Sequence, residues 1–474
     1  MSANRSGSRL DGQRLGCAIL GAGQRGAYVA ELLARRPDVK VLWLADAVLD
    51  RVQACAHRIG PRAEISTRWE QPLDDPHVEA VLIMLPDHLH VEAAEAAFAA
   101  GKHVFLEKPI ATTPIGVHSV IRAWRTSGRI LEIGYVLRYM PFYRAIRDVL
   151  QAGTLGRVRQ VALSEQIGVS LAATLMRSWH RLSRHTGGLL VHKCCHDLDL
   201  ICWLLQTRPR AVASFGGLGT FSRPAPAEFC SACPEREGCA FADTGAYEAR
   251  SPAEQADPTR FGLDRCVFSS DKDTIDNQVL AFEMENEVRG TFALAVQGTG
   301  GSDRHISVIG DLGRLDGHFG SGAFTVVFND GRSPRSWRAL GEGSGHERGD
   351  EAILLKFVQA CLGQAPERPS ELLAAGNLFA LAAERARCTE TVVRLGAGDL
   401  SWPDETASSV ARAAQAARYL DVPTLSLNAG SHPVRNAKAP ARHSGFDPEK
   451  PGLGPGVEFT HGDEPGVKPR RKGD

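Results

Sequence analysis

Two segments of the chain carry ionisable side chains at spacings that suit proton transfer. His192, His196 and Asp199 lie at positions i, i+4 and i+7, so on a helix they share one face. A carboxylate one turn from an imidazole fixes the ring tautomer and stabilises its protonated form, which suits a general base near neutral pH. Lys108 follows the apolar run His103–Leu106 after a single residue. An ammonium group at such a strand end can stabilise negative charge on a substrate oxygen.

Each of these groups also has a simpler explanation. Two histidines four residues apart can bind a metal ion, or they can be structural groups with satisfied hydrogen bonds. Lys108 could be a solvated lysine in a loop. The catalytic interpretation of Lys108, His192 and His196 therefore depends on a cofactor site in the same sheet as Lys108.

The start of the chain supplies the pattern of such a site. Gly21-x-Gly23-x-x-Gly26 lies between a predicted strand, Leu15–Leu20, and a predicted helix, Gln24–Arg36. In dinucleotide-binding proteins the first glycine permits a tight turn, the second lets the backbone approach the pyrophosphate, and the third lets helix and strand pack closely. The phosphates then lie at the positive end of the helix dipole. The pattern predicts dinucleotide binding.

The choice between NAD and NADP depends on the end of the next strand. Asp46 directly follows the predicted strand Val39–Ala45. Its carboxylate would accept hydrogen bonds from a ribose 2′-hydroxyl and repel a 2′-phosphate, which favours NAD. Arg51 lies close by in the sequence and keeps NADP open.

The elements that must position these groups are short apolar strands alternating with helices. Further buried strands are predicted at 80–85, 103–106 and 130–134. This alternation predicts a doubly wound parallel sheet, a Rossmann domain, over residues 14–138. Residues 1–13 are polar and are expected to be disordered.

The pattern changes after Tyr139. Strand-like segments with polar residues at alternate positions predict an antiparallel sheet with one solvated face, combined with helices, over residues 139–422. Residues 221–270 form an irregular insert rich in Pro, Gly and Cys. Residues 423–474 have almost no large aliphatic side chains and are expected to be a disordered tail.

Composition excludes several classes of partner. The 474 residues include 55 basic and 55 acidic side chains, so no net field draws the chain to nucleic acid or to an anionic membrane. The apolar runs are far shorter than the about 20 residues that cross a bilayer, and the polar start has no signal region. We therefore expect a cytoplasmic protein without membrane or nucleic-acid partners, acting on a small molecule.

Taken together, several motifs resemble the Gfo/Idh/MocA family, the relatives of glucose–fructose oxidoreductase and inositol 2-dehydrogenase. The resemblance covers about residues 14 to 400. It implies an α/β fold: an N-terminal Rossmann domain and a C-terminal α/β domain built on an open, mostly antiparallel sheet that often mediates oligomerisation, so a homo-oligomer is expected. Besides the glycine pattern, the motifs are Pro86-Asp87-His88-x-His90, Glu107-Lys108-Pro109, and Gly187-Gly188 followed by His196-Asp197-x-Asp199.

The resemblance also implies roles for individual residues. Lys108 would hold and polarise the substrate hydroxyl, His196 would take its proton, and Asp199 would help to bind substrate. Tyr135, Arg138, Trp179 and Lys193 are further candidate substrate contacts. The candidate cofactor contacts are Gly21, Gly23, Gln24, Arg25, Gly26, Asp46, Arg51, Pro86, His88, His90, Glu107 and Lys108.

One position departs from the family pattern. The family commonly has an acidic residue four positions before the histidine, and here that position is His192. His192 could relay a proton, Lys193 could substitute, or the chemistry could differ.

The insert contains Cys230-x-x-Cys233 followed by Cys239 and later Cys266. A segment with little aliphatic content to bury can be ordered by a metal clip, so we expect these four cysteines to bind a structural zinc ion. Free thiols, an iron–sulfur centre or a redox pair are the alternatives. An insert of this kind also resembles one branch of the same family.

The motifs favour an NAD(P)-dependent oxidoreductase that transfers hydride between nicotinamide and a secondary hydroxyl or ketone of a sugar, cyclitol or sugar derivative. Ser344-Gly345-His346 with Asp350 resembles a segment of the family's NAD-dependent glycosidases, so a redox-elimination enzyme is an alternative. A third hypothesis is a non-catalytic, sugar-sensing regulator on the same fold.

Overall fold

The computed structural model describes residues 14–60, 62–243, 252–258, 262–269, 271–298, 301–338, 347–364 and 372–396. The predicted tails, 1–13 and 423–474, lie outside these residues, as does a helix expected at 406–420. No helix in the described part of the chain is long and apolar enough to cross a membrane.

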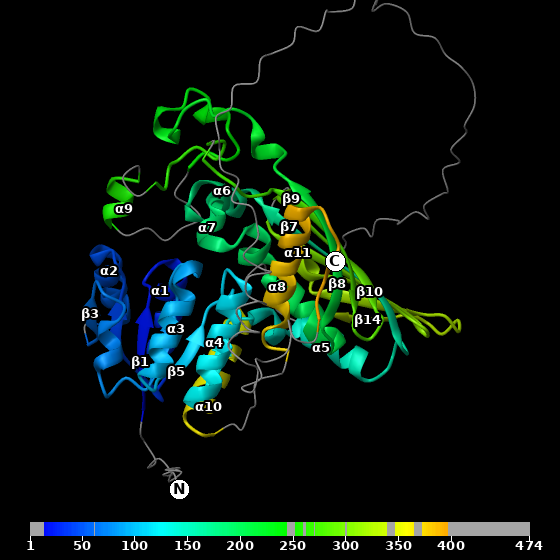
Figure 1. Cartoon of the computed structure of the whole chain (residues 1–474), viewed down its shortest axis with the longest axis horizontal. Helices are drawn as coiled ribbons and strands as arrows, with labels where there is room; N and C mark the ends of the chain where they lie inside the picture. The colour runs from blue at the N-terminus through cyan, green and yellow to red at the C-terminus, as the bar shows by residue number, and fades with distance from the viewer. Residues whose placement is uncertain are drawn as a thin grey trace, which may run out of the picture. The chain divides into compact units, whose positions relative to one another are not determined.

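The first half of the chain folds around a six-stranded sheet in which all neighbouring strands are parallel (Figure 1). The strand order is β3-β2-β1-β4-β5-β6. The chain therefore adds β2 and β3 on one side of β1, and then adds β4, β5 and β6 on its other side. The strands are β1 (Leu15–Leu20), β2 (Val39–Ala45), β3 (Glu64–Ser66), β4 (Ala80–Ile83), β5 (His103–Leu106) and β6 (Leu131–Ile133). The connecting helices are α1 (Gln24–Ala34), α2 (Leu49–Ile59), α3 (His90–Ala99) and α4 (Pro114–Ser127).

Both faces of this sheet are covered, which explains why its strands are apolar throughout. Cys17 and Ile19 of β1 pack in one cluster with residues of α1 and α2, whereas Ala18 and Leu20 pack in another with residues of α3 and α4. Successive side chains of a strand point to opposite faces, so a strand buried on both sides reads as a continuous apolar run.

The cluster on the α1 side contains one helix from much later in the sequence. Helix α10 (Glu347–Cys361) contributes Ile353, Leu354 and Phe357 to it, and the Phe357 ring lies 5.6 Å from that of Phe105 in β5. The six-stranded sheet is therefore completed by a helix that comes after strand β14 of the second sheet in the sequence.

The second half of the chain forms a nine-stranded sheet of order β14-β13-β12-β11-β7-β10-β9-β8-β15. Only β7 and β10 pair in parallel, so the predicted fold class, a Rossmann domain with an open, mostly antiparallel second sheet, is confirmed. The strands are β7 (Val158–Gly168), β8 (Pro209–Gly217), β9 (Asn277–Met284), β10 (Arg289–Gly298), β11 (Asp303–Gly310), β12 (Gly313–His318), β13 (Ala323–Phe328), β14 (Arg335–Arg338) and β15 (Val393–Arg394).

Helix α8 (Leu189–Leu205) carries the His192–Asp199 segment and is buried along almost all of its length. It packs against α11 (Ala375–Thr389) so closely that a Cβ on Gly376 would lie 2.4 Å from the Cα of Asp199. The remaining helices of this half are α5 (Pro141–Gln151), α6 (Val169–Arg177), α7 (Ser183–Thr186) and α9 (Pro252–Ala256).

A buried ionic network fastens α8 to the second sheet. Arg304 of β11 donates to Asp197 and to Glu165 of β7, both at 2.6 Å, and Lys193 lies 2.5 Å from the same Glu165 oxygen. Burial alone would raise the pKa of Glu165, but Arg304 and Lys193 lower it to about 2. These ion pairs join Asp197 and Lys193 of α8 to the sheet. They therefore fix the orientation of α8 and of the histidines that it carries.

Candidate active site

The three glycines of the first turn have different surroundings. Gly21 has a φ of 101°, and a Cβ there would lie 2.4 Å from the Met84 carbonyl oxygen. A Cβ on Gly26 would lie 1.8 Å from the Gly21 carbonyl oxygen, whereas one on Gly23 would meet nothing within 4 Å. The turn is thus closed on the protein side and open at Gly23, as a backbone that receives a pyrophosphate should be.

Asp46 is fixed at the edge of this turn. Its Oδ2 accepts from the Ala22 amide at 2.8 Å, and its Oδ1 accepts from the Val48 amide at 2.9 Å. Arg51 of α2 lies 4.0 Å from Asp46 Oδ1, but its main partner is Glu254 of α9, which accepts from Nε at 2.8 Å and from Nη2 at 2.5 Å. The arginine beside the ribose position is therefore held by carboxylates.

A cavity of about 1060 Å³ extends over the turn. Its floor is the glycine turn, Asp46 and Pro86, and its opposite wall comes from the second half of the chain. A dinucleotide fits the volume, the open backbone at Gly23 and the carboxylate at the strand end. The residues of the opposite wall are Ser178, Trp179, His180, Pro252, Glu254 and Leu263.

Arg25 and Glu107 also belong to this region, but they are paired with each other. Arg25 donates from Nε to Glu107 and from Nη2 to Asp350 of α10, both at 2.6 Å. Burial would raise the pKa of Glu107, but Arg25 and Lys108 together lower it. Arg25 lines the cavity, whereas its charge is compensated by two carboxylates.

Lys108 reaches the helix that carries the predicted base. Its Nζ donates to the backbone carbonyl of His192 at 2.8 Å. In an α-helix that carbonyl is the acceptor for the amide of residue 196, so the ammonium group lies against the turn that carries His196. The structure thus brings Lys108 of the first domain against the turn of α8 that begins at His192.

His192 has a carboxylate partner that the sequence spacing did not reveal. Its Nδ1 lies 2.6 Å from Oδ2 of Asp87, in the loop after β4. Burial raises the pKa of Asp87 to about 7 and lowers that of His192 well below its ordinary value. The rings of Trp179 and His180 lie 5.6 and 4.5 Å from the His192 ring, so this pair adjoins the wall of the nucleotide cavity.

Three predicted substrate contacts are occupied by protein partners. Arg138 binds Asp199 through two hydrogen bonds of 2.7 and 2.5 Å, and Lys193 is paired with Glu165. Burial raises the pKa of Asp199 to about 6, although Arg138 opposes the shift. Tyr135 is buried, with its ring 6.2 Å from that of His196.

The two histidines of the Pro86 loop do not line the nucleotide cavity. His90 is fully buried, with Nδ1 2.7 Å from the Pro109 carbonyl oxygen and Nε2 2.9 Å from that of Leu85. His88 lies at the surface with its ring 4.6 Å from that of His185. His90 therefore links the strand ends that carry Pro86 and Lys108.

The four cysteines of the insert line one small cavity of about 10 Å³. The two ends of the cluster meet through a bridge between Phe229 and Arg265, and the Cys266 amide donates to the Glu228 carbonyl at 2.8 Å. Within the described residues, sets of three potential ligand atoms all within 4.8 Å of one another occur at Asp303, His305 and His318 and at Glu165, Cys194 and Asp197. The four cysteine sulfurs do not form such a set.

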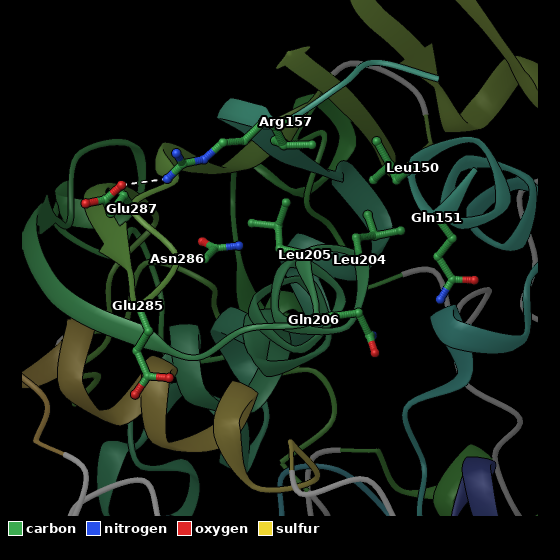
Figure 2. A pocket seen from close by; sticks show the side chains of 10 residues that line it. Leu150, Gln151, Arg157, Leu204, Leu205, Gln206, Glu285, Asn286 and Glu287 are labelled. Carbon is green, nitrogen blue, oxygen red and sulfur yellow. Dashed lines mark hydrogen bonds and ion pairs between the residues drawn. The ribbon is translucent and has the colours of Figure 1, made fainter. Parts of the chain in front are cut away.

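A second depression, of about 610 Å³, lies at the carboxyl end of α8 (Figure 2). Leu204 and Leu205 line it from the last turn of α8, and Arg157 and Glu287 pair at 2.6 Å on one side of it. It shares no lining residue with the nucleotide cavity.

Comparison with known proteins assigns both halves of the chain. Residues 15–135 match the family model described as "Oxidoreductase family, NAD-binding Rossmann fold", and residues 143–316 match the GFO/IDH/MocA C-terminal domain. The chain belongs to the Gfo/Idh/MocA family. The family resemblance expected from the motifs is thereby confirmed.

Two curated Gfo/Idh/MocA relatives are similar over part of their length. The scyllo-inositol 2-dehydrogenase (NAD(+)) of Bacillus subtilis is 26% identical over 202 residues, 42% of this chain and 56% of the relative. The inositol 2-dehydrogenase of Streptomyces avermitilis is 30% identical over 217 residues, 45% of this chain and 58% of the relative. The chain thus spans little more than half the length of either relative.

Solved structures share the fold over a longer stretch. A levoglucosan dehydrogenase in complex with NADH superimposes with a TM-score of 0.65 at 18% identity, covering 81% of this chain and 100% of that one. A myo-inositol 2-dehydrogenase from Lactobacillus plantarum gives a TM-score of 0.60 at 18% identity, again over 81% of this chain and 100% of that one. At these identities the likeness shows the fold.

Proposed function

We propose that the chain is an NAD-dependent dehydrogenase that transfers hydride between nicotinamide and a secondary hydroxyl or ketone of a sugar, a cyclitol or a sugar derivative. The observation that carries this proposal is the contact of Lys108 Nζ with the His192 carbonyl, in a chain whose glycine turn lines a cavity that fits a dinucleotide. The names of the inositol and levoglucosan dehydrogenases support the substrate class.

In this proposal, one residue accepts the proton of the substrate and another stabilises the negative charge that develops on its oxygen. NAD, when bound, supplies the hydride acceptor. His196 takes the proton of the substrate hydroxyl, and the Lys108 ammonium stabilises the alkoxide that develops. One preorganised donor of this kind contributes about 3 kcal/mol to the transition state. Asp87 fixes the orientation of His192, which accepts the proton onward from the site.

The test is a panel of polyols, cyclitols and sugars incubated with NAD⁺ and NADP⁺ and followed at the nicotinamide absorbance. Net NADH formation with a cyclitol or sugar is the expected result. Substrate cleavage without net NADH would instead indicate the redox-elimination alternative. Its Ser344-Gly345-His346 motif lies outside the described residues, and Asp350 is paired with Arg25. Binding of sugar without turnover would indicate a sensor.

We also propose that Cys230, Cys233, Cys239 and Cys266 bind a structural zinc ion, which requires their sulfurs to lie closer together than they do in this structure. Their common cavity is about the size of one atom, and thiolates are the ligands that structural zinc prefers. We place the protein in a reducing compartment such as the cytoplasm, where cysteines stay available as metal ligands. Elemental analysis should find one zinc per chain, and replacing Cys233 and Cys239 by serine should remove it.

The open face of the second sheet supports a homo-oligomer. Phe215 and Val279 face each other across β8 and β9, and Ile309 and Val327 lie on the same face of β11 and β13. All four are exposed, Phe215 at 72%. Exposed apolar side chains on one sheet face mark an association surface, and a second copy of the same sheet is the occupant we propose. Light scattering should give more than one chain per particle, and Val279→Lys should reduce that number.

A further inference from the structure

The insert of the second domain contributes a buried carboxylate to the nucleotide cavity. Glu254 of α9 is 4% exposed and accepts two hydrogen bonds from Arg51. Both residues line the same cavity as Asp46 and the glycine turn. The contact therefore joins the insert to the part of the cavity where a ribose beside Asp46 would lie.

Among the arginines that line this cavity, Arg51 is the one that forms an ion pair with Asp46. Its Nη1 lies 4.0 Å from Asp46 Oδ1. An arginine beside that ribose commonly accommodates the 2′-phosphate of NADP. Here it lies between Asp46 and Glu254, so two carboxylates and one guanidinium leave a net charge of −1.

The other cation of the cavity wall on α2 is also compensated. The Nε of Arg58 lies 3.2 Å from a carboxylate oxygen of Glu31 in α1. Among the described residues, this is the ion pair that Arg58 makes. His57 and Asp50 line the cavity as well, and the second of them adds negative charge. A 2′-phosphate would thus meet a wall whose arginines, Arg25, Arg51 and Arg58, already have acidic partners.

We propose that Glu254 is a specificity-determining residue that selects NAD over NADP by holding Arg51 away from a 2′-phosphate. This inference rests on the proposed function only in assuming that the cavity binds a nicotinamide dinucleotide. Glu254 acts through Arg51, so it is a positioning residue, and its effect is on the choice of nucleotide rather than on proton transfer.

The position of Glu254 is set by contacts at the base of the insert. Arg177 of α6 donates to the carbonyls of Phe241 and Leu263, and its Nη1 lies 3.3 Å from Asp243. Leu263 itself lines the nucleotide cavity. The two arms of the insert are therefore tied to α6 on both sides of α9, which keeps the carboxylate over the site.

The experiment compares NADH and NADPH binding by Glu254→Gln with binding by the unaltered protein, using nicotinamide fluorescence. The amide keeps the shape of the side chain and removes its charge. We expect the affinity for NADPH relative to NADH to rise about tenfold, because the freed guanidinium can pair with the 2′-phosphate. This gain should shrink as the salt concentration rises.

Two further variants make the result specific. Glu228→Gln removes the same charge from an exposed position of the same insert and should leave the ratio unchanged. Arg51→Ala in the Glu254→Gln background should abolish the gain. The proposal is overturned if Glu254→Gln keeps the original ratio while binding NADH normally, or if the double variant keeps the gain.

Binding is measured without turnover, so this outcome is separable from that of the dehydrogenase proposal. A changed nucleotide ratio with no oxidised substrate would refute the dehydrogenase and support the role of Glu254. Failure of the unaltered protein to bind either nucleotide would refute both.

Discussion

Asp87 and His192 are joined across the two domains by a hydrogen bond of 2.6 Å between Oδ2 and Nδ1. Asp87 follows a strand of the Rossmann sheet, and His192 lies one turn before His196 on α8. Where the family commonly has an acidic residue on the helix, this chain has an imidazole whose carboxylate partner comes from the other domain. The contact joins segments 105 residues apart.

This pair predicts a pH dependence. Burial raises the pKa of Asp87 to about 7, although His90 and Lys108 oppose the shift, and His180 and Glu107 are the other ionisable groups nearby. Ionised Asp87 stabilises a positive charge on His192, so the rate of substrate oxidation should rise with pH through about 7. Asp87→Asn should lose this rise. A rise of equal size in the variant would show that another group titrates.

Stability provides a second measurement on the same variant. The folded-state pKa of Asp87 lies above its ordinary value of 3.8, so the folded protein binds more protons than the unfolded chain between these values. The contribution of Asp87 to the free energy of unfolding is thus largest at low pH, and it declines as the pH rises towards about 7. Thermal unfolding of Asp87→Asn should show less of this decline than that of the unaltered protein.

Lys108→Met should remove turnover while nucleotide binding persists. The ammonium group stabilises charge only in the transition state, so we expect kcat to fall by about 100-fold or more. The affinity for NADH should change little, because the glycine turn and Asp46 are unaffected. Lys40→Met, at an exposed position of β2, is the matched control. Retention of kcat by Lys108→Met would remove the basis of the proposed mechanism.

The glycines of the turn should separate folding from binding. Gly23→Ala places a methyl group in open space, so the protein should unfold at the same temperature but bind NADH more weakly. Gly26→Ala forces a Cβ to within 1.8 Å of the Gly21 carbonyl oxygen and should lower both stability and binding. Equal NADH affinity in Gly23→Ala and the unaltered protein would place the pyrophosphate elsewhere.

Arg138→Met should destabilise the fold. It leaves Asp199, which is 1% exposed, without its cationic partner, and breaking a buried pair in this way costs about 3–5 kcal/mol. Chemical denaturation should show this loss, and Arg138→Met combined with Asp199→Leu should recover part of it. If the single variant were as stable as the parent and changed only KM, the two residues would serve substrate binding instead.

The sequence predicted the structure most accurately where a single strand or turn determines the local pattern of residues. β1, β2 and β5 begin and end at the predicted residues, since each is a compact apolar run bounded by turn residues. Helix α2 was missed because it is polar overall, with only Val52 and Cys55 buried among its eleven residues, so its apolar face is narrow. Its position nevertheless decides where Arg51 lies.

The candidate site was predictable only where its residues lie in one local sequence pattern. Spacing along one helix placed His192 and His196 on α8, and the glycine pattern located the nucleotide turn. The partners Asp87 and Glu254 escaped prediction, because their contacts join segments more than 100 residues apart and leave no local periodicity. Asp199 was assigned to substrate, whereas its oxygens bind Arg138.

The return of α10 to the first sheet bears on how this chain can be divided or recombined. Ile353, Leu354 and Phe357 cover a face that β1 and α1 leave open, and Asp350 neutralises Arg25. A fragment that stops after β6 would expose this apolar face to water. A chimera that exchanges the nucleotide-binding half with that of a relative should therefore carry Glu347–Cys361 along with it.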